Sequence, residues 1–170
     1  DNKNAGENKE VTVSGLLLTG DGASNYQLAS ETLSGNIGKI SPKELSATQV
    51  ATVTKTYDKN KNASFDTMQI TLDTTGVISG DTVNIVSGSG SYDSVNAGER
   101  TITVTDVNLD NSNYSLGATA VTGSESEAGK LAGRITPKEL SATQVAKVTK
   151  TYDKSDVASF NNSNLDLEGI

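Results

Sequence analysis

A long internal repeat constrains this chain more than any other feature of its sequence. The segment Ile40–Phe65 (ISPKELSATQVATVTKTYDKNKNASF) returns as Ile135–Phe160 (ITPKELSATQVAKVTKTYDKSDVASF), with 21 of 26 aligned positions identical and a spacing of 135 − 40 = 95 residues. A solenoid repeat is shorter than this and cannot bury its own apolar face alone. A period of 95 residues has instead the size of one small domain that folds independently. The repeat therefore predicts an array of similar small domains.

The similarity continues outside this segment and sets the phase of the array. Upstream, Val11–Leu28 matches Ile102–Leu116. We therefore expect residues 1–39 to be the C-terminal half of one repeat, 40–134 one complete repeat, and 135–170 the N-terminal part of the next. A chain that begins and ends within a repeat is expected to be a piece of a longer one. Alternatively, the structural unit is offset from the sequence repeat, and two domains of roughly 85 residues fit the chain.

Composition and periodicity favour strands throughout. Hydrophobic residues make up 34% of the chain, with 16 Gly and no Trp, which suits thin sheet-on-sheet cores. Val50–Tyr57 and Val145–Tyr152 are rich in Val and Thr, and Thr67–Asp73 alternates apolar and polar residues. No stretch has helical periodicity. The predicted fold is all-β, with tandem immunoglobulin-like β-sandwich repeats in an elongated array.

Shorter features refine this prediction. The apolar positions change parity at the same place in both copies, which predicts β-bulges at Ser14-Gly15 and Thr105-Asp106. Pro42 and Pro137 are expected to mark domain junctions, because proline cannot sit centrally in a ladder. Additional short strands are predicted at Asn25–Leu28, Asp81–Val86, Ser89–Tyr92 and Asn113–Leu116, and an exposed, length-tolerant loop at Thr122–Lys130.

Charge and missing residue types exclude several function classes. The net charge is −7 and the pI is near 4.5, which argues against nucleic acid and against anionic membrane surfaces as partners. No apolar run is long enough for membrane insertion. Cysteine and histidine are absent, which removes disulfides, Ser-His and Cys-His nucleophile systems and the usual zinc ligands. We therefore do not expect an enzyme.

The ordered motifs resemble a known family. The run PKELSA, KTYD, SGD-V, then Asn96-Ala97-Gly98, TITVTDVNL and NYSL, followed by I-T-P-K, resembles the YDG-type repeat of large bacterial surface adhesins, over essentially the whole chain. This is not the methylcytosine-reading domain that shares those letters. The resemblance implies a secreted, cell-surface, multi-repeat protein of haemagglutinin-like or fibrillar adhesin type. Lys59 and Lys154 replace the Gly of the name-giving motif, so we expect Asn60 to take the positive φ of the turn.

One turn has the oxygen spacing of a calcium loop. The calcium candidates are Asp58, Asn60, Asn62 and Asp66. The Gly and Glu that such a loop needs at its sixth and twelfth positions are missing, and nearby lysines repel a cation. The alternative is an Asx-type turn after the strand. Calcium is thus the one cofactor considered, and no other is expected.

Two lysines are candidates for covalent chemistry. Alternation places Lys55 on one strand face with Val53 and Tyr57, and Lys150 occupies the same place in the second copy. A buried, neutral lysine beside an acid and an asparagine can form an internal isopeptide bond. The alternative is a lysine that extends its charged end to solvent.

These observations predict a role rather than a ligand. We expect a structural stalk or fibre module of a bacterial cell-surface adhesin or extracellular filament, whose partners are neighbouring repeats or identical subunits joined head to tail. Strand complementation between incomplete repeats would give an open fibre, whereas a continuous polypeptide needs no such exchange. The alternative function is a ligand-binding adhesin module that contacts host or matrix glycans or proteins through loops such as Thr122–Lys130.

Overall fold

The protein is built from strands and turns. The computed structural model describes residues 2–123 and 127–170. The helical segments in these residues are four three-residue 3-10 helices: η1 Ala23–Asn25, η2 Thr74–Gly76, η3 Ala118–Ala120 and η4 Asn162–Asn164. Within the described part of the chain, no helix has the length and apolar character needed to span a membrane. The all-β prediction is confirmed.

Fourteen strands follow one another along the described chain. They are β1 Gly6–Ser14, β2 Thr32–Ile40, β3 Lys43–Glu44, β4 Ala47–Gln49, β5 Val53–Thr56, β6 Asn62–Phe65, β7 Ile70–Leu72, β8 Ile85–Tyr92, β9 Gly98–Leu109, β10 Tyr114–Ser115, β11 Val121–Thr122, β12 Lys130–Thr136, β13 Ser141–Gln144 and β14 Leu165–Glu168. Strands β3–β12 form a central unit, β1 and β2 pair before it, and β13 and β14 pair after it.

The central unit has one main core between two sheets. The larger sheet has the order β5-β12-β9-β8-β6 and the smaller one β11-β4-β7. Alternate side chains of both sheets enter the same cluster, because successive residues of a strand point to opposite faces. Its members include Ala47, Val53, Phe65, Ile70, Tyr92, Ile102, Val121, Leu131 and Ile135. A second, small cluster of Leu45, Val83 and Tyr114 lies under the pair β3 and β10.

The first and last strands of the central unit run side by side. β3 pairs with β10, β4 with β11, and β5 with β12, and all three pairings are parallel. Neighbouring parallel strands cannot be joined by a tight turn, so the intervening chain must return across the unit. The start and the end of the repeat are therefore held together by backbone hydrogen bonds.

The flanking strand pairs reproduce parts of the central unit. In β4 and β7 the partners are Ala47↔Leu72 and Gln49↔Ile70; in β13 and β14 they are Ala142↔Leu167 and Gln144↔Leu165, which is the same register 95 residues later. The pair β1–β2 likewise repeats β9–β12, since Lys9↔Gly38 corresponds to Arg100↔Gly133. In these two flanking segments the sequence repeat is accompanied by a repeated strand pairing.

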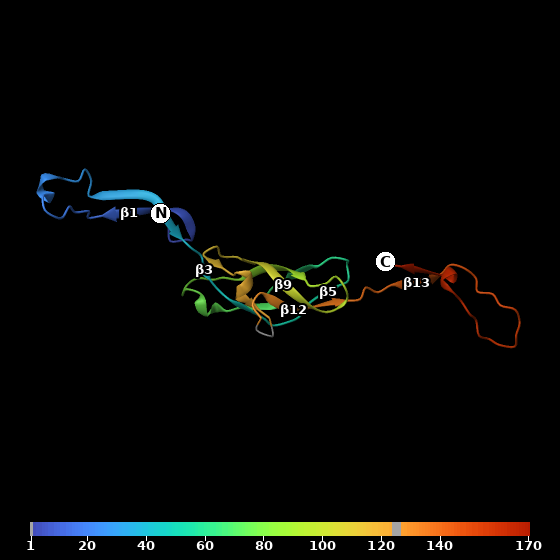
Figure 1. Cartoon of the computed structure of the whole chain (residues 1–170). Coiled ribbons are helices and arrows are strands. Elements are labelled where there is room, and N and C mark those ends of the chain that lie inside the picture. The colour runs from blue at the N-terminus through green and yellow to red at the C-terminus, as the bar shows by residue number, and fades with distance from the viewer. Residues whose placement is uncertain (1, 124–126) are drawn as a thin grey trace.

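The three parts follow one another along the molecule. Figure 1 shows the β1–β2 hairpin extending from one end of the central unit and the β13–β14 segment from the other. Ser41-Pro42 lies between β2 and β3, and Pro137 follows β12 directly. Both prolines therefore lie between the central unit and a flanking strand pair.

Two predicted strands differ from the observed ones. Val50–Tyr57 contributes only the four residues of β5, and Val145–Tyr152 contains no strand. The reason is the partner: β5 exists as a strand because Val53–Thr56 pairs with Gly133–Thr136 of β12. Among the described residues, 145–152 have no such partner strand. Val and Thr content favours strand geometry, but the ladder requires a neighbour.

The bulge prediction is confirmed in one copy and wrong in the other. Ser89↔Asp106 is followed by Gly90↔Val104, which leaves Thr105 as the extra residue of β9. Near Gly15, strand β1 simply ends at Ser14. A bulge needs a paired neighbour on that side, which β8 supplies to β9.

Three other predictions are corrected. Asp81–Asn84 is not a strand, because β8 begins at Ile85; nor is Asn25–Leu28, where η1 and an extended segment are found. The predicted loop Thr122–Lys130 begins in β11 and ends in β12, and Glu127 and Ala128 are exposed, while Gly123 and Gly129 are buried. Residues 124–126 lie outside the described part.

Candidate functional site

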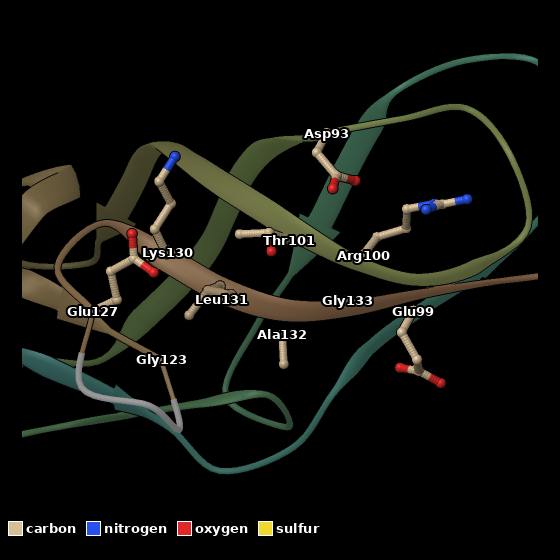
Figure 2. Close-up of a pocket in the computed structure, with 10 residues that line it drawn as sticks. All are labelled: Asp93, Glu99, Arg100, Thr101, Gly123, Glu127, Lys130, Leu131, Ala132 and Gly133. Atoms are coloured by element: carbon tan, nitrogen blue, oxygen red, sulfur yellow. The ribbon is translucent and has the colours of Figure 1, made fainter.

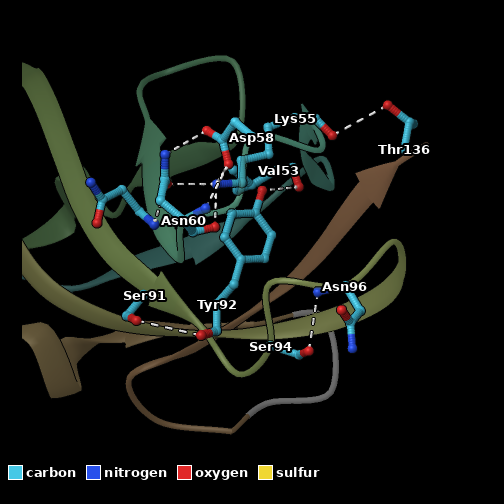
Figure 3. A network of polar contacts seen from close by, with 10 residues as sticks. Val53, Lys55, Asp58, Asn60, Ser91, Tyr92, Ser94, Asn96 and Thr136 are labelled. Atoms are coloured by element: carbon cyan, nitrogen blue, oxygen red, sulfur yellow. Dashed lines mark hydrogen bonds and ion pairs between the residues drawn. The ribbon is translucent and has the colours of Figure 1, made fainter. Parts of the chain in front are cut away.

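The turn after β5 gathers the predicted site residues around one ammonium group. Lys55 Nζ lies 2.7 Å from Asp58 Oδ1, 2.8 Å from Asn60 O and 2.8 Å from Asn60 Oδ1 (Figure 3). The Asp58 carboxylate also accepts the Asn60 backbone N–H at 3.1 Å, which closes an Asx turn. The Asx-turn alternative to the calcium loop thus describes the observed geometry.

An aromatic ring covers the other side of this lysine. Lys55 Nζ lies 5.3 Å from the centroid of Tyr92, which is buried in β8 and whose hydroxyl donates to Val53 O at 3.0 Å. The ring face attracts the cation. Burial, and secondarily the charge of Asp58, raises the pKa of Tyr92 above its ordinary value. Tyr92 therefore stays a neutral hydroxyl donor.

The carboxylate of this site is held in its charged form. The hydrogen bond from Lys55 is the first cause that lowers the pKa of Asp58, and the bond from the Asn60 backbone is the second. The same arrangement recurs in the second copy, where Lys150 Nζ contacts Asp153 Oδ1 at 2.8 Å and Ser155 O at 2.6 Å. What both copies share is an ammonium ion bound by a carboxylate and by at least one backbone carbonyl.

The positive φ of the turn falls on a different residue from the one expected. Lys59 has φ 67° and Lys154 has φ 63°, and Asn60 is not among the residues with positive φ, so that expectation is wrong. The side chain of Asn60 is occupied in binding Lys55, which fixes its backbone in place. Lys59 and Lys154 stand where the YDG pattern has Gly, and they adopt the backbone geometry for which Gly is suited.

The calcium candidates do not converge. Asp58 and Asn60 meet at Lys55, but Asn62 contributes only its backbone N–H to Asn60 Oδ1, at 2.9 Å. Asp66 turns toward the next loop, where Oδ1 accepts the Met68 N–H at 2.7 Å. Among the described residues, no group of three or more acidic or other metal-ligating side chains gathers. At Asp58 and Asn60, the Lys55 ammonium supplies the positive charge that the side-chain oxygens bind.

The isopeptide candidates have the right neighbours but not the right charges. Lys55, Asn60 and Asp58 are the three residue types that such a bond needs, and they are in contact. The reaction requires an acid that can donate a proton, whereas the pKa of Asp58 is lowered. In the second copy Ser155 replaces the asparagine, so the amide is missing from that turn. The geometry is that of an ion pair.

A shallow pocket of about 360 Å³ lies over β9 and β12 (Figure 2). Arg100 and Lys130 line it, together with Asp93, Glu99 and Glu127. Arg100 already donates to Asn96 O and Ala97 O at 2.7 and 2.9 Å, and Lys130 to Thr103 Oγ1 at 2.7 Å. These cations are engaged within the protein.

A buried glutamine joins the two sheets and was missed by the sequence reasoning. Gln49 Nε2 donates to Ala132 O at 2.8 Å and to Ala51 O at 2.9 Å, and Gln49 Oε1 accepts the Ala132 N–H at 2.7 Å. Strand β5 pairs with β12 only from Gly133 onward. The Gln49 amide therefore takes the place of a strand partner at Ala132.

The side-chain contacts at the junctions are the second feature that the sequence reasoning did not predict. At the first junction, Asn113 Oδ1 accepts the Ala5 N–H at 2.7 Å and Asn113 Nδ2 donates to Asn4 Oδ1 at 3.3 Å. Asn4-Ala5-Gly6 recurs as Asn96-Ala97-Gly98. At the second junction this copy borders an open groove of about 540 Å³, which Pro137, Lys138 and Leu140 also line. The recurring Asn-Ala-Gly triplet was the available signal.

Comparison with known proteins places the chain in a family. The model of the YDG domain matches residues 1–33 and 41–122, which is more than half of the chain. No curated protein and no solved structure matches it. The break between the two matched segments falls within β2 and at the first junction. With its Tyr57-Asp58 turn, its repeated strand pairs and this match, the chain belongs to the YDG-domain family.

Proposed function

We propose that this chain is a structural stalk or fibre module of a bacterial cell-surface adhesin or extracellular filament, built as a tandem array of immunoglobulin-like sandwiches. The observation that carries the proposal is the repetition of strand pairing at a fixed interval. β13 and β14 pair in the register of β4 and β7, in units that follow one another from end to end (Figure 1). Such an array gains length with every repeat.

The chemistry of the chain agrees with a structural role. Two of its lysines stabilise turns, since Lys55 pairs with Asp58 and Lys150 with Asp153. Histidine and cysteine are absent from the sequence, so the common nucleophile systems have no residues. A module without catalysis is also what the sequence predicted. Its proposed location is the cell exterior, with neighbouring repeats as the main partners.

The alternative is a module that binds host or matrix glycans or proteins. The pocket of Figure 2 borders the loop Thr122–Lys130 and offers both acidic and basic groups. Its two cationic side chains are already bonded within the protein, which reduces what it offers to a ligand. We therefore rank this alternative second.

The test compares the chain with a version in which residues 40–134 are duplicated. Small-angle scattering should give a maximum dimension that rises by a constant length for each added repeat. A terminal epitope displayed on bacterial cells through the two versions should become more accessible to antibody with the longer one. A compact particle whose length does not grow would contradict the proposal. Saturable binding of a matrix glycan or protein, lost on substitution of Arg100 and Lys130, would favour the alternative.

A further inference from the structure

The first junction combines a strand pair at the end of the central unit with side-chain contacts to the part that precedes it. Strand β3 pairs in parallel with β10, through Lys43 N to Asn113 O at 2.8 Å and Leu45 N to Ser115 O at 2.9 Å. Leu45 packs against Tyr114, and both are almost fully buried. The Asn113 side chain meanwhile bonds Asn4 and Ala5 of the preceding part. The strand that begins at Asn113-Tyr114 thus contacts both β3 and the part of the chain that precedes the central unit.

At the second junction the receiving half is present and uncovered. Lys138 and Leu140 correspond to Lys43 and Leu45 across the 95-residue spacing, and Asn96 and Ala97 correspond to Asn4 and Ala5. All four line the groove of about 540 Å³. Leu140 is 48% exposed, against 5% for Leu45.

The matching strand is also present and uncovered, at the other end of the chain. Asn25-Tyr26-Gln27-Leu28 corresponds to Asn113–Leu116. Its turn is already shaped alike, since Tyr26 N donates to Ala23 O and Tyr114 N to Asn111 O, both at 3.1 Å. Tyr26 is 76% exposed, whereas Tyr114 is 4% exposed.

We propose that this groove is a docking site for the Asn-Tyr strand of an adjoining unit, and that a second copy of this chain occupies it with Asn25–Leu28. Lys138 N–H would bond the Asn25 carbonyl and Leu140 N–H the Gln27 carbonyl, with the Tyr26 ring on Leu140. Strand addition of this kind combines backbone hydrogen bonds with one side-chain anchor. The inference rests on the proposed stalk role, because it assigns the contact that the end of one unit makes with the next molecule along the stalk.

The structure limits the contact to this strand. Residues 1–40 and 135–170 contain counterparts of strands on both sides of the core, but none of β8, Ile85–Tyr92, which lies inside the larger sheet. A contact made through Asn25–Leu28 therefore does not require a whole unit to be rebuilt. The contact is small and weak, and because it joins different surfaces of the two copies it extends into open chains rather than closed dimers.

The test uses two variants that each remove one side of the contact. Tyr26→Glu leaves the groove intact and removes the side-chain anchor of the docking strand. Leu140→Glu leaves the docking strand intact and disrupts the groove. Sedimentation from micromolar to millimolar concentration should show growing chains for the wild type and monomers for each variant alone. The two variants mixed retain one intact contact and should stop at dimers. Met68→Glu is the matched control, since Met68 is 70% exposed and absent from the lining of the groove.

A peptide titration separates this inference from the proposed function. A synthetic peptide of residues 20–30 added to the Tyr26→Glu protein should shift the amide signals of Lys138 and Leu140, whereas the same peptide carrying Tyr26→Glu should not. Absence of both peptide binding and wild-type association would overturn the docking proposal. Association that persists in both variants would also overturn it. Neither result changes the scattering lengths on which the stalk proposal depends.

Discussion

Single residues in the turn after β5 explain how this chain departs from the pattern of its family. Lys59 occupies a left-handed backbone geometry that costs most side chains free energy, while its neighbours Asp58 and Asn60 hold the Lys55 ammonium. The turn is therefore stabilised by an ion pair and strained at one position. This strain can be removed without touching the ion pair.

Replacing Lys59 by Gly should stabilise the protein. Lys59→Gly relieves the positive φ of 67° and should raise the free energy of unfolding by about 1 kcal/mol. Urea unfolding followed by circular dichroism measures the change. Lys59→Ala is the control, because it removes the same side chain but keeps Cβ, and it should give no gain. Equal gains in both variants would show that the lysine side chain, not the backbone, is responsible.

The contact between Lys55 and Asn60 should remain noncovalent. Because the pKa of Asp58 is lowered, this carboxyl is not available to protonate the amide, and no ammonia should be lost. Intact-mass spectrometry of the purified chain should give the mass calculated from the sequence. A measured mass smaller than the calculated one by one ammonia would establish the isopeptide bond instead, provided that the Asn60→Ala variant has the mass calculated for its own sequence.

Among strands and sheets, pairing is decided by partners as much as by residue preference. Val50–Tyr57 and Val145–Tyr152 are nearly identical in sequence, yet β5 forms only in the first. The sequence repeat, the all-β class and the bulge at Thr105 were predictable from periodicity. The parallel pairing of β5 with β12 was not, because it joins residues about 80 positions apart and leaves no local pattern.

The buried Gln49 should be far more important than its exposed counterpart. Gln49→Ala leaves the Ala132 N–H and carbonyl without these partners at a partly buried site, and should lower the free energy of unfolding by about 2 kcal/mol. Gln144→Ala makes the same change at an exposed site, where Gln144 bonds only Ala146 O, at 3.0 Å, and should change it by less than about 0.5 kcal/mol. Equal losses in urea unfolding would contradict the role assigned to Gln49.

A close approach of β8 and β9 should tolerate no side chain at Gly90. A Cβ there would lie 2.6 Å from Thr103 O and 2.7 Å from Ile102 Cγ2, so Gly90→Ala should cost about 1–3 kcal/mol of unfolding free energy. Gly117 is the control: it has φ −65° and open space around a Cβ, so Gly117→Ala should be neutral or stabilising by up to about 1 kcal/mol. Thermal midpoints of both variants test the contrast.

For the whole molecule, acidic turns set the pH range of stability. Hydrogen bonds lower the pKa values of Asp58, Asp73, Asp110 and Asp153 below their ordinary value of 3.8. A folded-state pKa below the unfolded value contributes stability above pH 3.8, and this contribution is lost as the pH falls through the folded pKa.

Urea midpoints should therefore be level near neutral pH and fall below about pH 4. Asp58→Asn should lower the midpoint at neutral pH and flatten the acid decline, since one of the titrating groups is gone. Curves for this variant and the wild type that run parallel down to low pH would show that Asp58 does not contribute to the decline.

The three parallel pairings have a mechanical consequence. The chain enters the central unit beside β3 and leaves it after β12, at opposite ends (Figure 1). Tension applied along the array pulls the strands of the parallel pair β5–β12 past each other. Bonds such as Tyr57 N to Thr136 O are then loaded together and in shear, instead of opening one at a time. The same topology that buries the core also makes each unit resist being stretched.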